Sequence, residues 1–367
     1  MSLLKNVFNI TDFGAIADGK TDCTIAIQKA IDVAEKVQGT VYVPSGVFLC
    51  GQVDLKPFVT IEGYGRWTYR ENGGSVLSLC DDKAGCLINM TNAYGAAVKG
   101  VCLQGNGIGD NIHGIATLRE DEESLNQEDG FLIDGCRISG FSGDGIRFQR
   151  VWCYSVRHSQ LCFNQGNGLY MKGWDAFISD CWFSHNEGAG VCSDKEISAV
   201  IFTANRVEEN FTAGLKLINP INVTITGNAF DSNGGPALDM NSPLGTRAIN
   251  ISVVGNNFHR SGMPNMRNEN SGDSCHLHIF RAMNCVVQSN VFYQNCDNYG
   301  NRQTVCPKIG MIIGKLKNCI IKDNVMMNCA TDKVFIDRGQ NDSDNLIEIK
   351  GSVKNKTDKW IYPFFDD

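Results

Sequence analysis

Proline is scarce in this chain, with 8 residues among 367, whereas glycine is abundant, with 39. Many glycines with few prolines favour many tight turns over an extended linker. A surplus of positive charge is also missing, because the formal net charge is −7. The composition therefore gives no electrostatic reason to expect binding to nucleic acid or to an anionic membrane surface.

Long apolar runs are absent as well, and no stretch approaches the roughly 18 residues of a membrane-spanning helix. The first residues, MSLLKNVFNITDFG, have neither the basic segment nor the long apolar segment of a secretory signal. We therefore expect an intracellular protein, a virion component, or a secreted protein whose leader is missing from this sequence.

Paired cysteine motifs are missing although the chain has 16 cysteines. No C-x-x-C pair occurs, and the cysteines are scattered over apolar positions of predicted strands. This pattern favours buried free thiols and gives no zinc site. No other cofactor is evident, and a calcium ion at the acidic segment 120–129 is an alternative to the reading of that segment as a solvated loop.

The chain contains an internal sequence repeat. One apolar column has steps of 23, 22, 24, 23, 28, 34 and 34 residues and consists of Ile138, Leu161, Phe183, Val207, Phe230, Phe258, Phe292 and Met326. Asparagine columns run beside it and include Asn164, Asn186, Asn210, Asn233 and Asn295, as well as Asn222, Asn250, Asn284 and Asn318. A unit of about 23 residues with three short strands buries its apolar face only when it is stacked on others. We therefore predict an all-β fold, a single-stranded right-handed parallel β-helix with stacked asparagines at its corners.

The repeat predicts a single domain over residues 1–367. Residues of about 1–50 form an N-terminal cap, about 51–340 form the coils, and about 341–367 close the stack. In the cap, the segment KTDCTIAIQKAIDVAEKV predicts a helix. Its apolar stripe is expected to consist of Ile25, Ala26, Ala30, Ile31 and Ala34. Thr21 or Asp22 is the expected N-cap.

The segments VFNITDFGAIADGKTDCTIAIQKAIDVA and GTVYVPSGVFLC resemble the N-terminal signature of the pectin-lyase-like β-helix superfamily. Polygalacturonases, pectate-lyase-like enzymes, alginate epimerases and phage tailspikes share this signature. The resemblance implies the fold and work on carbohydrate polymers, but it does not imply one reaction. Of the polygalacturonase motifs, FSGDGIRF retains only Asp144, and the Asp-Pro-His of alginate epimerases is absent. A weaker similarity to inulin fructotransferases implies an acidic pair at Asp175 and Glu187, although Asn186 stands where the second acid belongs.

Insertions into the repeat fall at approximately 116–128, 241–248, 262–274 and 296–308. All of them flank the same stack of predicted strands. Long loops in a compact repeat are usually functional or disordered. We therefore expect a binding groove over this stack.

Strand alternation places two outward columns in the expected groove. The first is Arg147, Tyr170, Cys192, Lys216, Asp239 and His278, and the second is Gln149, Lys172, Asp194, Ile218, Asn241 and Phe280. The predicted catalytic groups are Lys216, Asp239, His278 and Asp194, because a carboxylate beside a lysine or histidine can set pKa values for proton transfer. Substrate binding is predicted for Arg147, Tyr170, Lys172, Asn241 and Phe280, and Trp174 is a further candidate for stacking on sugar rings. The competing interpretation is a charged sheet surface with modest cross-strand stabilisation. Outside the groove, Glu208 and Glu209 are expected at a solvated corner.

These residues predict an enzyme that cleaves or rearranges a polysaccharide or oligosaccharide, either a lyase or a glycosidase. A glycosidase needs two carboxyl groups roughly 5–5.5 or 6.5–9.5 Å apart. Asp194 and Asp239 lie two coils apart, about 12 Å by strand geometry, so Asp239 would need Glu269 or Asp273 as its partner. A lyase needs a base and positive charge for an acidic sugar, which suits Lys216 and His278. The alternative is a non-catalytic, tailspike-like glycan-binding protein. The chain is expected to be a monomer or a homotrimer, and an exposed apolar stripe on another sheet would mark a trimer interface.

Overall fold

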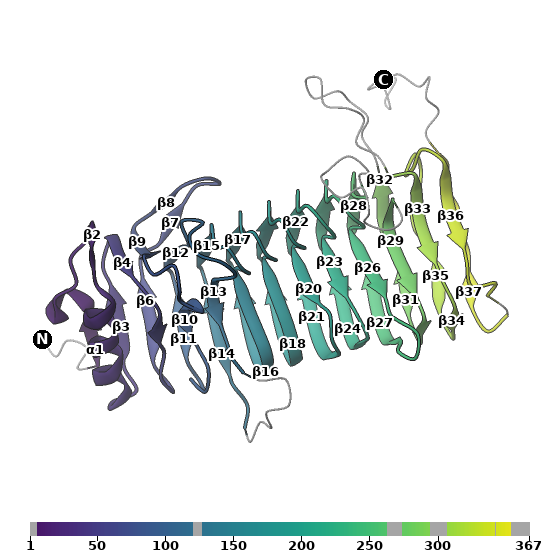
Figure 1. Cartoon of the computed structure of the whole chain (residues 1–367). Helices are drawn as coiled ribbons and strands as arrows, with labels where there is room; N and C mark the ends of the chain where they lie inside the picture. Colours follow the sequence, from purple (N-terminus) through teal and green to yellow (C-terminus); the bar gives the residue numbers. More distant parts are fainter. Residues whose placement is uncertain (1–5, 120–126, 263–273, 294–306, 342, 354–367) are drawn as a thin grey trace, which may run out of the picture.

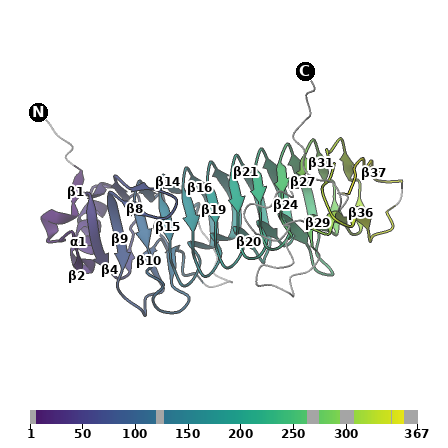
Figure 2. The ribbon, with the colours of Figure 1, turned by 90° about the horizontal axis from the view of Figure 1, so that it is seen from above.

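The computed structural model describes residues 6–119, 127–262, 274–293, 307–341 and 343–353. The coils are stacked along one axis into an elongated solenoid, and both views show the same regular stack (Figures 1 and 2). In the described part of the chain every strand pair is parallel, apart from the hairpin of β7 (Arg66–Trp67) and β8 (Asn72–Gly73). The predicted parallel β-helix is therefore confirmed.

Each coil contributes strands to three faces, which we number in chain order. The first face contains β5 (Val53–Asp54), β10 (Cys86–Asn89), β13 (His113–Ala116), the first halves of β16 (Ile146–Arg157) and β18 (Leu169–Ser179), β20 (Val191–Ser193), β23 (Leu215–Leu217), β26 (Leu238–Asn241), β29 (Cys275–Phe280), β33 (Ile309–Ile313) and β36 (Lys333–Asp337). The second face contains β1 (Val7–Asn9), β3 (Thr40–Val43), β6 (Thr60–Gly63), β11 (Ala97–Lys99), β14 (Phe131–Asp134), the second halves of β16 and β18, β21 (Ile197–Thr203), β24 (Pro220–Thr226), β27 (Ala248–Val254), β30 (Ala282–Met283), β31 (Val286–Gln288), β34 (Leu316–Lys317), β35 (Ile320–Lys322) and β37 (Leu346–Ile347). The third face is an 11-stranded sheet of β2 (Asp18–Asp22), β4 (Gly46–Cys50), β9 (Ser75–Leu79), β12 (Cys102–Gln104), β15 (Arg137–Ser139), β17 (Gln160–Cys162), β19 (Trp182–Ser184), β22 (Arg206–Glu208), β25 (Ala229–Asp231), β28 (Asn257–His259) and β32 (Val291–Tyr293).

The first and second faces form one continuous 24-stranded sheet, because β16 and β18 run without a break around the corner between them. The apolar column predicted from the sequence runs in register along the third face from Ile138 to Phe292. The last strand, β37, pairs in parallel with β35, so the segment expected to close the stack adds one more rung.

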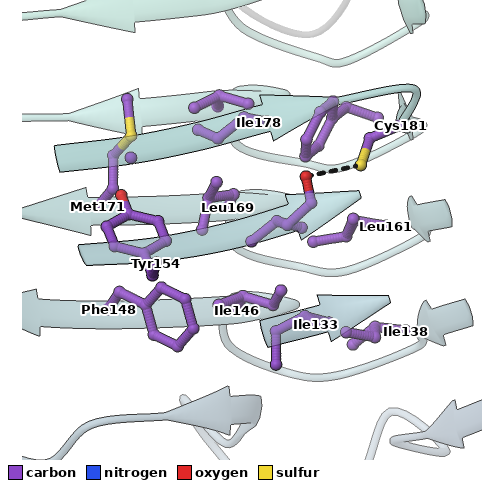
Figure 3. Packing of buried hydrophobic residues seen from close by; sticks show 14 of the residues in the cluster. Ile133, Ile138, Ile146, Phe148, Tyr154, Leu161, Leu169, Met171, Ile178 and Cys181 are labelled. Atoms are coloured by element: carbon purple, nitrogen blue, oxygen red, sulfur yellow. Dashed lines mark hydrogen bonds between the residues drawn. The ribbon is translucent and has the colours of Figure 1, made fainter. Parts of the chain in front are cut away.

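The core lies inside the solenoid, where inward side chains of the three faces meet. Figure 3 shows Ile146 and Leu169 from the first face, Ile133 and Ile178 from the second, and Leu161 from the third. Farther along the axis, the predicted column becomes a stack of rings: the centroids of Phe230 and Phe258 are 5.1 Å apart, and those of Phe258 and Phe292 are 4.8 Å apart. Each coil therefore buries its apolar residues mainly against the coils above and below it.

Two buried asparagine ladders hold the corners. Their side chains donate to the next amide oxygen along Asn164, Asn186, Asn210 and Asn233, and along Asn205, Asn228, Asn256, Asn290 and Asn324. A third, exposed ladder joins Asn222, Asn250, Asn284 and Asn318. The predicted ladders are confirmed, and Asn295 lies outside the described residues. Many residues that precede a buried ladder asparagine have a left-handed backbone, such as His185 (φ 53°) and Glu209 (φ 53°), which turns the chain through the corner.

The N-terminal end is capped by the helix α1 (Thr24–Glu35), preceded by the short 3₁₀ helix η1 (Ile10–Phe13). The buried stripe of α1 consists of Ala26, Ile27, Ala30, Ile31 and Ala34. Ile25 is 71% exposed, so its expected place in the stripe was wrong. The reason is helical spacing, because Ile27 and not Ile25 lies three and four residues before Ala30 and Ile31.

The N-cap of α1 is Cys23, which makes no side-chain capping bond. Asp22, one residue earlier, accepts hydrogen bonds from the backbone N–H and the hydroxyl of Thr24.

Most of the described cysteines are buried free thiols, as expected; Cys153 and Cys192 are half-buried, and Cys80 is exposed.

A buried ion pair joins Arg119 to Asp129, which lie on either side of residues 120–126. Arg119 donates to both carboxylate oxygens of Asp129, and both side chains are fully buried. Arg119 also donates to the carbonyl of Arg150, while Asp129 accepts from the backbone N–H of Trp152. The acidic segment was expected to be solvated, but its last residue, Asp129, belongs to the packed interior.

Candidate active site

The first outward column runs in register across the first face. Arg147 pairs with Tyr170, Tyr170 with Cys192, Cys192 with Lys216, Lys216 with Asp239, and Asp239 with His278. The predicted order is therefore correct, including the step across the insertion at 262–274. The chemical roles of these side chains stay predictions.

Asp239 and His278 form the closest pair of titratable side chains in this column. The Nδ1 atom of His278 is 3.3 Å from Oδ1 of Asp239, and the two side chains are 9% and 19% exposed. Lys216 lies on the preceding coil, half-buried, beside Asp239. The two groups are within ion-pair distance but are not hydrogen-bonded, because Oδ1 of Asp239 has no hydrogen-bond partner among the described residues. A small rotation of the imidazole would let the carboxylate hold a proton on Nδ1 and leave Nε2 as the proton acceptor. The pair can therefore carry out proton transfer.

Arg147, Tyr170 and Asp194 form a second polar group on the same face. The Arg147 guanidinium lies 4.1 Å from the centroid of the Tyr170 ring, and the Tyr170 hydroxyl donates to Asp194 over 2.7 Å. Burial, aided by the Asp194 carboxylate, raises the pKa of Tyr170, so the hydroxyl stays protonated and remains a donor. The ring is only 5% exposed. In this arrangement Tyr170 positions Arg147 and Asp194 and offers little ring surface to a sugar.

Arg147 is held in place by buried groups behind the first face. It donates to Asp144 over 2.8 Å, and Asp144 in turn accepts from the backbone and side-chain N–H groups of Asn167. The backbone N–H of Asp144 donates to Nδ1 of His113. Burial lowers the pKa of His113 to about 4, against the opposing effect of Asp144. Only the FSGDGIRF motif drew attention to Asp144, and nothing in the sequence pointed to His113.

The second outward column is less regular. Asn241 and Phe280 are in register on adjacent coils, as predicted, and the Phe280 ring lies 6.2 Å from that of His278. The Arg281 guanidinium lies 4.5 Å from the Phe280 ring centroid. Lys172 follows Met171 on β18, at the point where the register with β16 shifts at a bulge. Lys172, Asn241 and Phe280 therefore remain candidates for substrate contact at the two ends of the column.

The alternative acidic pair does not come together. Asp175 lies at the corner between the first and second faces, where its carboxylate accepts from the indole N–H of Trp152 over 2.6 Å. Glu187 is exposed in the turn that follows β19 on the third face. Asn186, at the position of the second acid, is a buried member of the asparagine ladder. The two carboxylates belong to different corners of their coils, so the structure lends this pair no support as a catalytic unit, and its role stays a prediction.

Within 6–119, 127–262, 274–293, 307–341 and 343–353, no three side chains of His, Cys, Asp or Glu gather in a way that could hold a metal ion. The same part of the chain has no helix of the length and apolarity needed to cross a membrane. Glu269 and Asp273, the expected partners of Asp239, lie outside the described residues.

Residues 124–262 match the family described as right-handed β-helix region. Over 95% of its length the chain resembles the A-module of mannuronan C-5 epimerase AlgE4 of Azotobacter vinelandii, with a TM-score of 0.70, 17% identity and 100% of that chain covered. The chain thus has the right-handed parallel β-helix fold that the N-terminal signature predicted.

Two curated proteins of Azotobacter vinelandii are similar in sequence. Alginate lyase 7 is 30% identical over 195 residues, which cover 47% of this chain and 21% of the lyase. Mannuronan C5-epimerase AlgE3 is 37% identical over 98 residues, which cover 24% of this chain and 5% of the epimerase. The chain thus spans about a fifth or less of the length of these relatives.

Proposed function

We propose that the chain acts on an acidic polysaccharide laid across the coils of the first face, with His278 as the base that removes a proton from the sugar. The observation that carries this proposal is the 3.3 Å contact between His278 and Asp239. The contact lies in a column that also contains the cations Arg147 and Lys216. Base and positive charge are the two requirements for proton abstraction next to a sugar carboxylate.

In the proposed reaction Asp239 holds the proton on Nδ1 of His278, and Nε2 takes the proton from C5 of a uronate residue. Lys216, one coil away, neutralises the negative charge that develops on the uronate carboxylate. In elimination, the C5–H electron pair forms the C4–C5 double bond and the glycosidic oxygen leaves C4 with the bonding electrons. Transfer of a proton from a water molecule to the opposite side of C5 would instead invert that centre without cleavage.

Both outcomes correspond to the activities in the relatives' names, alginate lyase and mannuronan C5-epimerase. Hydrolysis by two carboxylates has less support. Asp194 is hydrogen-bonded to Tyr170 and lies two coils from Asp239, beyond the separations that glycosidases use.

The competing function is glycan binding without chemistry, in a tailspike-like trimer. The outward column of the second face includes Phe177 and Ile201, which are 57% and 39% exposed on adjacent coils. Polar Thr224 and Ser252 follow on the next two coils. The interruption gives less support to an apolar trimer interface than to the enzyme.

The deciding experiment treats mannuronan, alginate and neutral polysaccharides with the protein and reads three signals on the same samples. Absorbance of unsaturated uronate ends reports elimination, reducing ends without that absorbance report hydrolysis, and NMR of the C5 configuration reports epimerisation. The proposal expects elimination or epimerisation on uronates, abolished in the His278→Gln variant. Reducing ends alone would contradict it, and binding with none of the three signals would favour the glycan-binding protein.

A further inference from the structure

A second cluster of titratable and aromatic side chains lies on the third face, away from the candidate active site. The hairpin β7–β8 lies beside this face (Figure 1) and positions Tyr69 between its two strands. The Tyr69 hydroxyl is 2.7 Å from Nδ1 of His185, and Nε2 of His185 is 3.1 Å from Oε2 of Glu209. The Tyr69 hydroxyl thus joins the hairpin to two adjacent coils of the solenoid.

The positions of the protons among Tyr69, His185 and Glu209 follow from the chemistry of the three side chains. The Tyr69 hydroxyl lies within hydrogen-bond distance of Nδ1 of His185, at 2.7 Å, and of Oε2 of Glu209, at 3.5 Å. The Glu209 carboxylate near Nε2 favours a proton on that nitrogen, which leaves Nδ1 as an acceptor for the Tyr69 hydroxyl. Burial raises the pKa of Tyr69 to about 12, so the phenol keeps its proton. The side chains of His185 and Glu209 remain 32% and 35% exposed. Their polar atoms can therefore reach a ligand as well as each other.

Tyr69 is held rigidly at the centre of an aromatic group. Its ring centroid lies 5.0 Å from that of Trp182, 5.6 Å from that of His185 and 5.8 Å from that of Phe163. Its backbone carbonyl accepts a hydrogen bond from the buried guanidinium of Arg137. The half-exposed ring of Tyr69, held through its backbone by Arg137, can pack against the apolar face of a sugar, and the hydrogen-bonding groups at its edge can bond the sugar hydroxyls. Little ordering of the protein would then oppose binding.

The charged groups around the cluster are already paired within the protein. Glu208 accepts from the indole N–H of Trp182 and from Arg206, and it is only 6% exposed, so its expected place at a solvated corner was wrong. Arg260 donates twice to Asp231. Beside these pairs, the half-buried carboxylate of Glu209 lies close to Tyr69, and the exposed residues Arg70 and Glu71 neighbour Tyr69 on the hairpin. An acidic sugar would be repelled here.

A buried donor beside the cluster also lacks a partner. Gln160 is 2% exposed and in register with Trp182, and its Nε2 atom has no hydrogen-bond partner among the described residues. A buried donor without a partner is costly in a folded protein unless water or a ligand satisfies it. This observation is independent of the Tyr69 contacts.

We propose that Tyr69, Trp182, His185 and Glu209 form a second carbohydrate-binding site, which takes a neutral sugar residue of a glycan. Tyr69 provides the stacking surface, and Glu209 and His185 bond the sugar hydroxyls. The site is separate from the first face and does not depend on the function proposed there.

The test is calorimetric titration of the whole chain with neutral hexasaccharides of glucose, galactose and mannose, and with the hexasaccharide of mannuronate. We expect at least one neutral sugar to bind, with an affinity that falls tenfold or more in Tyr69→Ala and in Glu209→Gln. The matched control is His158→Ala, which removes an exposed histidine that pairs with Asp134 and Asp180 at another corner. It should leave the affinity unchanged.

If Tyr69 only holds the hairpin against the third face and binds no sugar, a different result is expected. Such a role would lower the melting temperature of Tyr69→Ala, whereas Glu209→Gln, which keeps the side-chain shape, would retain both stability and any sugar affinity. The proposal is overturned if no neutral hexasaccharide binds, or if the affinity survives Glu209→Gln. It is also overturned if the affinity is lost in His278→Gln, because the sugar would then belong to the first face.

Discussion

Asp239 and His278 face each other on adjacent coils, with Oδ1 of Asp239 3.3 Å from Nδ1 of His278, although a long insertion separates their strands in the sequence. The inward neighbour of each residue explains this, because Leu238 and Leu277 are both fully buried and paired in register. A shift of one residue would turn Leu277 towards solvent. Packing in the core therefore fixes the geometry of the outward pair.

Replacement of His278 by Gln should reduce turnover on a uronate polymer by about 10²–10⁴-fold, the range expected for loss of a general base. Asp239→Asn should also lower kcat, by less, because the imidazole remains but loses its orienting charge. The measurement is the initial rate of unsaturated product or of C5 inversion. His158→Ala is the control, and a His278→Gln variant with undiminished kcat would exclude His278 as the base.

Lys216→Met should raise KM on an acidic polysaccharide about tenfold and make the rate less sensitive to salt, because one cation of the column is removed. The side chain is half-buried, and methionine retains much of its apolar stem. Initial rates at low and high ionic strength give the comparison. An unchanged KM at low salt would show that Lys216 does not contact the substrate.

Asn210→Ala should destabilise the solenoid by about 3 kcal/mol or more. The Asn210 side chain donates to the carbonyl of Phe183 and to Asn233, and it accepts from both N–H groups of Asn186, so its loss leaves buried polar groups unpaired. The control is Asn250→Gly in the exposed ladder, since glycine tolerates the left-handed backbone there (φ 58°). It should cost less than about 1 kcal/mol. Denaturant midpoints check both values, and equal losses would contradict the role of burial.

Arg119→Met should destabilise the fold by about 3–5 kcal/mol, because it leaves the Asp129 carboxylate buried without its counter-charge. The double variant Arg119→Met with Asp129→Asn should recover part of this loss, since the amide still accepts from Trp152 N–H and carries no charge. Melting temperatures of the four proteins complete the cycle. A double variant as unstable as the sum of the two single variants would show that the charges are not coupled.

The fold should lose stability as the pH falls from about 6.5 to about 4, in part because of His113. Burial lowers its pKa in the folded state from 6.5 to about 4, so the unfolded chain takes up a proton first. The contribution of His113 to the free energy of unfolding is complete above pH 6.5 and is lost by pH 4, with a size of about 3 kcal/mol. Buried His276, with a pKa lowered to about 3, adds a loss in the same direction. His113→Asn should flatten the pH dependence of the denaturant midpoint, and an unaltered slope would contradict this account.

The periodic part of the fold could be predicted from the sequence because each coil repeats the same local pattern. The column from Ile138 to Phe292 and the asparagine ladders follow from spacing alone. Ile25 was misplaced because an isolated helical stripe does not specify where the cap meets the first coil. Non-periodic contacts could not be predicted from the sequence. Asp175 accepts a hydrogen bond from the indole of Trp152 one coil away, and Tyr69 contacts His185 although 116 positions separate them in the sequence. Such pairs depend on tertiary neighbours that no local pattern encodes.

The buried thiols give the solenoid a set of chemical reporters along its length. From Cys23 in the cap to Cys329 near the last coils, most of the described cysteines are shielded, whereas Cys80 is exposed. A thiol reagent should thus modify Cys80 first and the half-buried Cys153 and Cys192 next, whereas modification of the fully buried cysteines of the described residues requires a coil to open. Mass spectrometry of the order of labelling would show whether the stack opens from its ends or as one cooperative unit.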